Sequence, residues 1–286
     1  MIKVKFCSFW CSEEELLVRC NRCTPNQDYK WKDLELTISD DYDFICILDY
    51  PGKTRYKASK AIYFSGEGSR MRNKFRIKKH FDPRQLGFYR VYDPDIYRTI
   101  STWYIDLNYK QLLTPALFLK HKELSTIISD NHSRPGHKDR LRFLKWLERI
   151  PLLDHYGRDS RGAFSNRATY RGSLASKEDG LLSYKYHFNA ENEYIPNYFT
   201  EKILDPIFCE TLCFYAGCPN LEKFVNPESF VRVDLNEPDN ALEIIEKSIR
   251  ERLWEKRLPV IRSEKHKFMT EENLLNVVWK IVHQKI

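Results

Sequence analysis

The sequence has no apolar run that approaches the roughly 20 residues needed to cross a bilayer, so it predicts no integral membrane segment. Internal repeats and low-complexity segments are also missing. The first residues, MIKVKFCSFW, have an apolar part too short for a signal peptide and lack a small-residue cleavage site. They form a strand pattern instead, and the composition is that of a soluble globular protein.

The 286 residues suit two domains of ordinary size. The formal charge is +7, and residues 55–98 and 134–171 are the basic stretches. An excess of this kind is compatible with nucleic-acid binding, with an anionic nucleotide-sugar ligand, or with solvated basic faces. No nucleic-acid motif is present, and the charges lie between apolar strand runs instead of forming one stripe, which disfavours the first of these.

The chain has eight cysteines, enough for a metal site or for disulfides. The eight are Cys7, Cys11, Cys20, Cys23, Cys46, Cys209, Cys213 and Cys218. Reduced and mostly buried thiols are favoured for a cytosolic protein of this size. A zinc site at Cys20-x-x-Cys23 with Cys7 and Cys11 is the alternative, and an exported protein would allow a disulfide between Cys20 and Cys23.

The N-terminal half alternates strand and helix patterns, which predicts an α/β domain with a mostly parallel sheet. Ser12 to Glu15 fits a capping box that opens a helix. The expected strands cover residues 2–9, 34–38, 42–48, 61–65, 87–92 and 103–107. The segment between Gly68 and Arg90 follows neither periodicity, and the linker to the second half is expected near residues 114–121.

The C-terminal half repeats the alternation. Expected strands cover 124–129, 152–156, 184–189, 212–216 and 230–235, and helices cover 139–150, 201 onward, 240–254 and 270–284. We therefore predict two Rossmann-like domains, residues 1–120 and 121–265, with residues 266–286 as a C-terminal helix. Ligands of open parallel sheets bind at the carboxyl ends of the strands, so both halves are expected to face one central cleft.

The most informative stretch is residues 184–220. An apolar and aromatic strand leads through a polar turn into Glu201-Lys202 at a helix start, and a second short strand ends in Gly217-Cys218-Pro219. A helix start offers free N–H groups and a positive dipole end to a phosphate, and Lys202 adds a full charge. The alternative is a solvated first helical turn, where glutamate is favoured in any case.

This stretch resembles the donor-site signature of the family 10 glycosyltransferases, the α-1,3/4-fucosyltransferases. The matching residues are Glu191-Asn192, Tyr198, Thr200-Glu201-Lys202, Gly217 and Pro219, followed downstream by residues 227–234. The resemblance implies a GT-B-like fold. It also implies donor-binding roles for Asn192, Tyr198, Glu201 and Lys202, with turn chemistry as the alternative for Asn192.

Further donor contacts follow from the same resemblance. Arg140, near a helix start, matches an arginine that the family uses on the pyrophosphate, and Arg142 is its competitor. Tyr156-Gly157-Arg158 resembles a turn that follows the next strand in the family, with an ordinary strand-end turn as the alternative.

The general base is expected on the first half. Glu67, in Phe64-Ser65-Gly66-Glu67, resembles the family's aromatic-x-Gly-Glu segment, and its carboxylate would take a proton from the attacking hydroxyl. Gly68 stands where the family usually has asparagine. Asp49, after the preceding strand, is the alternative base.

The resemblance implies an inverting transfer of fucose from GDP-fucose to a glycan hydroxyl, without an essential divalent metal or other cofactor. The partners expected are a GDP-sugar donor and a glycan acceptor, not nucleic acid. Another GDP-hexose is the alternative donor, and a non-catalytic nucleic-acid- or glycan-binding protein is less favoured. Animal and plant members usually have a Golgi membrane anchor and stem. Their absence here favours a cytoplasmic enzyme of bacterial or viral type, or a chain trimmed of its anchor.

Overall fold

The computed structural model describes residues 1–100 and 103–285, which divide into two compact units. The first contains Met1–Thr102, Leu107–Leu113 and Lys267–Ile286, and the second contains Trp103–Asp106 and Thr114–His266. The sequence placed this boundary near residue 120 and set residues 266–286 apart. The division by contacts instead returns nearly all of that terminal segment to the first unit.

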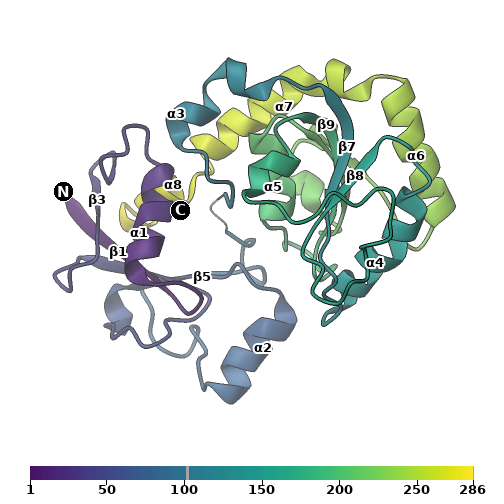
Figure 1. The fold of residues 1–286 in the computed structure, drawn as a ribbon. Coiled ribbons are helices and arrows are strands. Elements are labelled where there is room, and N and C mark those ends of the chain that lie inside the picture. The colour runs from purple at the N-terminus through teal and green to yellow at the C-terminus, as the bar shows by residue number, and fades with distance from the viewer. Residues whose placement is uncertain (101–102, 286) are drawn as a thin grey trace. The chain divides into compact units, whose positions relative to one another are not determined.

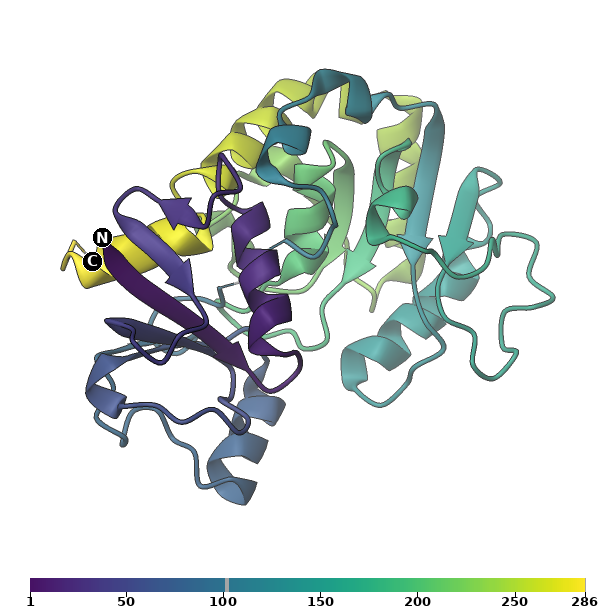
Figure 2. The ribbon, with the colours of Figure 1, turned by 60° about the vertical axis from the view of Figure 1, so that its left-hand side comes forward.

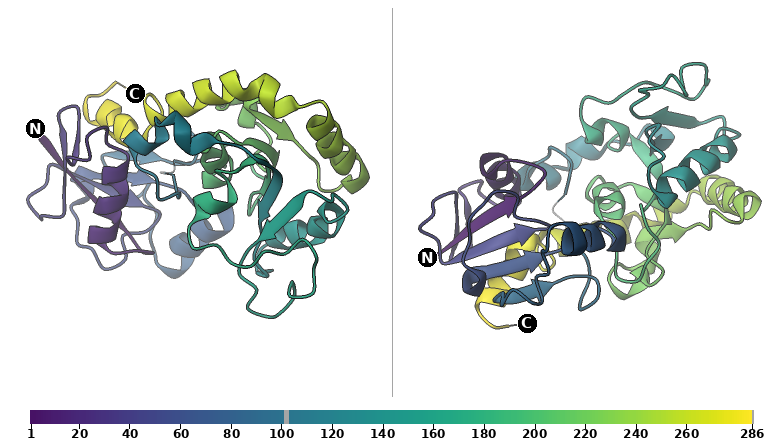
Figure 3. Two further views of the ribbon diagram at one scale, coloured as in Figure 1. Left: turned by 45° about the horizontal axis from the view of Figure 1, so that its top comes forward. Right: turned by 90° about the horizontal axis from the view of Figure 1, so that it is seen from below.

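The first unit is built on a six-stranded sheet in the order β2-β3-β1-β4-β5-β6, parallel except for β2 (Figure 1; Figure 3, right). Its strands are β1 (Ile2–Ser8), β2 (Lys30–Trp31), β3 (Leu34–Thr37), β4 (Phe44–Leu48), β5 (Ala61–Phe64) and β6 (Arg90–Tyr92). Its helices are α1 (Glu13–Arg22), α2 (Ser69–Lys78), α3 (Tyr109–Leu112) and α8 (Leu274–Val282).

Local sequence explains how these elements begin. Ser12 and Glu15 form the predicted capping box of α1, since each side chain accepts from the other residue's backbone N–H. All four residues of β5 are buried, as are Ile45, Cys46 and Ile47 in the centre of β4. Burial on both faces is typical of central strands in a parallel sheet.

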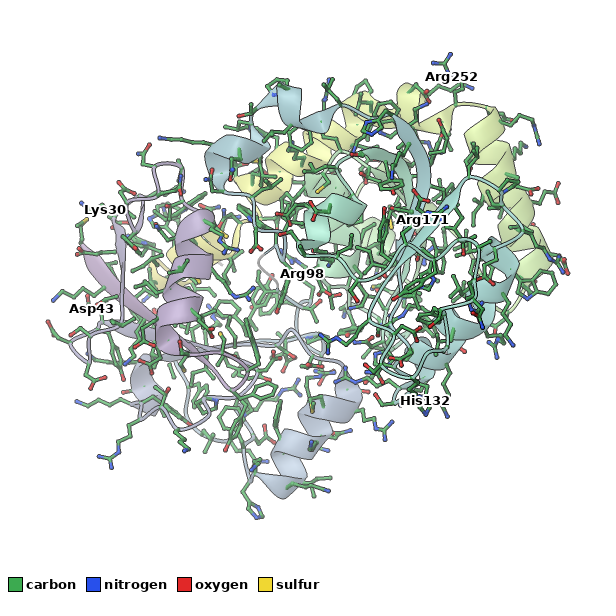
Figure 4. The ribbon with its side chains drawn as sticks, viewed as in Figure 1. Lys30, Asp43, Arg98, His132, Arg171 and Arg252 are labelled. Carbon is green, nitrogen blue, oxygen red and sulfur yellow. The ribbon has the colours of Figure 1, made fainter. Side chains whose placement is uncertain are left out.

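The C-terminal helix α8 lies beside the edge of the same sheet (Figure 2). Asn276 accepts hydrogen bonds from the Trp31 indole at 3.3 Å and from Lys32 at 2.7 Å. Arg98, labelled in Figure 4, pairs at 2.5 Å with Glu272, which precedes the helix. Asn273 caps α8, so the helix begins later than the Thr270 start predicted from the sequence.

The second unit has a parallel five-stranded sheet in the order β11-β10-β9-β7-β8. Its strands are β7 (Lys122–Ile127), β8 (Leu153–Tyr156), β9 (Tyr184–Ala190), β10 (Leu212–Ala216) and β11 (Phe230–Arg232). Its helices are α4 (Pro135–Leu147), α5 (Glu201–Phe208) and α6 (Pro238–Arg250), and α7 (Leu253–Met269) leads back to the first unit.

Helices cover both faces of this second sheet (Figure 1). On one face Phe143 and Leu147 of α4 and Ile245 of α6 share a core with Tyr186 and Phe188 of β9. On the other face α5 packs on β9 and β10. A doubly wound arrangement of this kind is Rossmann-like.

Among the segments that differ from expectation are the predicted strand at 103–107 and two of the longer helices. The predicted strand at 103–107 is wrong over its described residues: Trp103, Ile105 and Leu107 are buried in alternation, but no strand pairs with them. The amide of Tyr104 instead donates to Asp205 of α5 at 2.9 Å. The α2 and α7 helices were not predicted, because α2 buries one side chain, Phe75, and α7 contains a proline.

The cysteines are free thiols, and burial raises the pKa of Cys7 to about 12. Cys20 and Cys23 lie at the end of α1, where burial also raises the pKa of both. Across residues 1–100 and 103–285 no three His, Cys, Asp or Glu side chains gather as a metal site. In the same ranges no helix combines the length and apolar character that crossing a membrane requires.

Candidate active site

The strand order of the second unit places two helix starts at one point. The first strand, β7, lies between β8 and β9, and the helices that follow β7 and β9 cover opposite faces of the sheet. The starts of α4 and α5 therefore meet at the carboxyl ends of β7 and β9. Ligands of doubly wound sheets bind at such a switch point.

The start of α4 lies directly against the end of β9. A Cβ atom on Gly136 would be 2.0 Å from the Glu191 carbonyl oxygen, so no other residue fits without a backbone shift. One turn later Arg140 donates to the Ala190 carbonyl and, at 3.1 Å, to the Asn192 side chain. Burial lowers the pKa of Arg140. The structure thus brings the predicted Arg140 and Asn192 together.

Arg142, the competitor of Arg140, is oriented differently. Its side chain is 61% exposed and pairs with Asp139 on its own helix at 3.0 Å. His137 lies on the same turn of α4 as Arg140. Burial and the charges of Arg140 and Arg134 lower the pKa of His137 to about 4, so its imidazole is neutral at pH 7.

A buried carboxylate organises the start of α5. Glu191 is fully buried and accepts from the Thr200 amide at 2.8 Å, from the Thr200 hydroxyl at 2.8 Å and from the Tyr215 hydroxyl at 3.3 Å. Lys202 Nζ lies 3.6 Å from the same carboxylate. Burial raises the pKa of Glu191, although Lys202 and Thr200 oppose the shift. A Cβ on Gly217 would lie 2.6 Å from Glu191 Cγ, which explains the glycine there.

Two lysines hold the predicted Glu201 in place. Lys202 Nζ is 3.1 Å and Lys177 Nζ 3.9 Å from its carboxylate. Burial would raise the pKa of Glu201, but these charges and the Thr200 hydrogen bond lower it to about 2. Lys177 also pairs at 2.5 Å with Asp205, whose pKa burial raises to about 6. Glu201 is therefore an ionised acceptor at neutral pH.

The predicted Tyr156-Gly157-Arg158 turn ends the neighbouring strand β8. The Tyr156 hydroxyl lies 2.7 Å from that of Tyr184. Gly157 has φ +150°, and a Cβ there would lie 2.0 Å from the Ile128 carbonyl oxygen at the end of β7. The Arg158 side chain is exposed. The turn thus reaches the same edge of the sheet, with Gly157 packed closely on β7.

Tyr198 lies in the loop between β9 and α5 and is only 1% exposed. Its ring is thus part of the core. The contact predicted between its hydroxyl and a phosphate stays a prediction.

A pocket of about 330 Å³ opens at the carboxyl ends of β10 and β11. Its lining includes Gly217 and Pro219, which belong to the family signature found in the sequence, and also Tyr194 and Asp139. Tyr194 comes from the β9–α5 loop and Asp139 from α4, next to Arg140, so the pocket adjoins the Arg140 segment.

Glu67 belongs to the first unit and follows β5. Its amide and that of Gly66 donate to Asp49 Oδ1 at 2.9 and 2.8 Å. Asp49 is buried with φ +65°, and burial together with the Glu67 charge raises its pKa to about 7. The alternative base is thus bound to the backbone of the Glu67 turn, a position that suits a positioning role. Glu67 itself is half-buried.

Sequence reasoning gave no role to Glu191 and did not find Lys177. Glu191 carried a signal, because an acidic residue directly after a buried strand is out of place in a core. No feature of the sequence pointed to Lys177, since it comes from a polar segment far from α5 along the chain.

Comparison with known proteins supports the resemblance to α-1,3-fucosyltransferases found in the sequence. No family model matches the chain. Over 85 residues, 29% of this chain, the sequence is 38% identical to the α-(1,3)-fucosyltransferase FucT of Helicobacter pylori. The match spans 18% of that relative's length. The resemblance to α-1,3-fucosyltransferases is confirmed to this extent.

Solved structures establish the fold. One α1,3-fucosyltransferase structure has a TM-score of 0.54 at 19% identity and covers 90% of this chain and 80% of its own. The GDP complex has a TM-score of 0.52 at 20% identity, covering 90% and 81%. A T4 phage BGT mutant in complex with UDP-glucose has a TM-score of 0.56 at 11% identity, covering 98% and 99%. The chain has the predicted GT-B-like fold with two Rossmann-like units.

Proposed function

We propose that the chain is a glycosyltransferase that moves fucose from GDP-fucose to a hydroxyl group of a glycan, with inversion at the anomeric carbon. The observation that carries the proposal is the meeting of Arg140, Lys202 and two helix starts at the switch point of the second unit. Two fixed cations and the positive ends of two helix dipoles suit a diphosphate. The sequence match to a fucosyltransferase supports the choice of sugar.

Each group has a role in this reaction. Lys202 and Arg140 bind the diphosphate and stabilise the charge that develops on GDP as it leaves. Glu201, held ionised by Lys202 and Lys177, accepts a hydrogen bond from a hydroxyl of the donor. His137, neutral at pH 7, adds no charge of its own beside Arg140.

Glu67 acts as the general base of the transfer. It accepts the proton of the acceptor hydroxyl while that oxygen attacks the anomeric carbon, and the bond to GDP breaks. Asp49 fixes the backbone of the Glu67 turn through its two hydrogen bonds. Because fixed cations offset the charge of the leaving group, we propose that the reaction needs no divalent metal.

The test combines donor affinity with product analysis. We expect GDP, but not ADP, to bind measurably in calorimetry, and Lys202→Ala to weaken GDP binding by about 10- to 100-fold because a charged hydrogen bond is lost. Incubation with GDP-fucose and a glycan panel should yield a product heavier by one fucose in mass spectrometry.

Lys223→Ala provides the matched control, since Lys223 is an exposed lysine of the second unit. Its GDP affinity should equal that of the wild type. Unchanged GDP binding in Lys202→Ala would overturn the donor-site assignment. Transfer from another GDP-hexose with none from GDP-fucose would overturn the choice of sugar.

A further inference from the structure

Helix α2 of the first unit, which begins two residues after Glu67, carries charge of one sign. Residues 69–79 contain six basic side chains and no acidic one. Acidic residues are favoured in the first turn of a helix, but α2 has Arg70 and Arg72 there, and its cap Gly68 provides no side-chain hydrogen bond. An anion bound at this end would therefore be stabilised by both the helix and its side chains. Helix α2 is labelled in Figure 1.

One face of α2 lines a pocket of about 250 Å³ that lies wholly within the first unit. Residues three and four apart on a helix share a face, and Ser69, Arg72, Asn73 and Arg76 line the pocket from one face of α2, together with Phe75. The opposite side is formed by Tyr63, Phe81, Asp82, Arg84, Asp93 and Asp95. Ser69, which lines the pocket, follows the predicted base by two residues in the sequence.

The pocket holds three arginines and three aspartates, but the aspartates are already engaged. Arg84 Nη2 lies 2.9 Å from Asp93 and 2.7 Å from Asp95, and Arg72 lies 3.3 Å from Asp95. Asp82 accepts from the Arg84 amide at 3.1 Å. The acceptor groups of the pocket thus have protein partners.

The groups left over are donors. The Nε–H of Arg72 is buried without a hydrogen-bond partner, and Arg76 has no ion pair within the described part of the chain. Lys78 and Lys79 are exposed at the end of the same helix and add further positive charge. The remaining guanidinium donors, the Nε–H of Arg72 and the side chain of Arg76, match the oxygens of a carboxylate, phosphate or sulfate.

We propose that this pocket binds the anionic group of an acidic saccharide, and that the acceptor of the reaction is such a saccharide. That this saccharide is the acceptor of the reaction rests on the proposed function, whereas the binding site itself is argued from the pocket alone. Arg76 and the Arg72 Nε–H hold the anionic group. Because Ser69 lines the pocket, a sugar held there presents its neighbouring hydroxyls close to the Glu67 turn.

Calorimetry on the full chain at low salt tests the site with simple probes: glucuronic acid, glucose 6-phosphate, glucose and inorganic phosphate. We expect the two charged sugars to bind and glucose not to bind. Arg76→Gln should weaken binding of the charged sugars by about tenfold or more, because one charge-assisted hydrogen bond is lost. The two charged probes distinguish a carboxylate from a phosphate ester.

Lys74→Gln is the matched control, since it removes one charge from the same helix outside the pocket lining. It should change binding less than twofold. Equal weakening by both variants, equal binding of glucose, inorganic phosphate binding as tightly as glucose 6-phosphate, or competition by a short DNA duplex at lower concentration than any saccharide would each overturn the proposal.

GDP affinity separates this proposal from the proposed function. Arg76→Gln should leave GDP binding unchanged. Absence of GDP binding would remove the proposed function and leave the saccharide site standing, whereas intact GDP binding with no binding of charged sugars would remove the saccharide site alone.

Discussion

Two carboxylates of the first unit, Glu67 and Asp49, have different surroundings although both follow buried strands. One carboxylate oxygen of Asp49 accepts hydrogen bonds from the amides of Gly66 and Glu67, and burial raises the pKa of Asp49 to about 7. Glu67 is half-buried at the turn that Asp49 supports. The sequence identified both as candidates, but only the structure shows the positive φ of Asp49 and its hydrogen bonds to the backbone of the Glu67 turn.

Glu67→Gln should lower the rate of fucosyl transfer by about 10²- to 10⁴-fold, the contribution of a general base, and leave GDP affinity within a few-fold. Steady-state kinetics and calorimetry measure the two effects. Glu35→Gln on β3, a carboxylate of the same unit far from the turn in the chain, should keep full activity. A Glu67→Gln enzyme as fast as the wild type would eliminate Glu67 as the base.

At the scale of single elements, the short helix α5 shows how a proline is accommodated. Pro206 lacks the N–H that would bond to the Lys202 carbonyl in a regular helix. The side-chain amide of Asn189 on β9 donates to that carbonyl at 3.2 Å instead. The carbonyl that the proline leaves without a helical partner thus ties the helix that carries Lys202 to the strand that precedes Glu191.

The sequence predicted correctly those strands and helices whose apolar residues face the core at the spacing of a strand or a helix. The prediction failed where apolar residues are buried outside a sheet, or where a helix has no apolar face. Trp103 and Ile105 alternate as in a strand, yet they pack on the second unit without a β-ladder. The α2 helix lacks an apolar face because one of its faces lines a polar pocket. Lys177 reaches Glu201 through tertiary structure alone, which no local pattern encodes.

Gly136→Ala tests the contact between α4 and β9. The new methyl group would meet the Glu191 carbonyl, so the start of α4 must move, and overpacking of this kind typically costs about 1–3 kcal/mol of stability. Because Arg140 moves with the helix, we also expect weaker GDP binding. Chemical denaturation and calorimetry measure both.

Lys138→Ala, an exposed position on the same helix, is the control and should match the wild type in both measurements. A Gly136→Ala protein with wild-type stability and GDP affinity would contradict the close packing described for this contact.

At the scale of the whole molecule, the buried carboxyl groups predict how stability varies with pH. The folded-state pKa of Asp49, about 7, lies above the ordinary value of 3.8 for an aspartate. The folded protein therefore binds this proton more tightly than the unfolded chain, and the associated stability is lost as pH rises from about 4 to 7. Asp205, raised to about 6, acts in the same direction.

Asp49→Asn should flatten this dependence, because asparagine stays neutral and keeps an oxygen for the amides of Gly66 and Glu67. Urea denaturation at pH 5 and pH 8 should show a smaller loss of stability on going to pH 8 in the variant than in the wild type. Asp41→Asn, whose carboxylate is exposed, should retain the wild-type difference. An identical pH profile in Asp49→Asn would contradict the raised pKa.

The return of α8 to the first sheet has a practical consequence for dividing the polypeptide. Arg140, Lys177, Glu191, Glu201 and Lys202 all fall in Thr114–His266, and the rest of their unit, Trp103–Asp106, lies shortly before it, so that a single gene fragment for residues 103–266 encodes the whole unit. The half with Glu67 has no such fragment, because Asn276 and Glu272 complete it from the far end of the chain. Its gene would have to be spliced from pieces or rearranged by circular permutation.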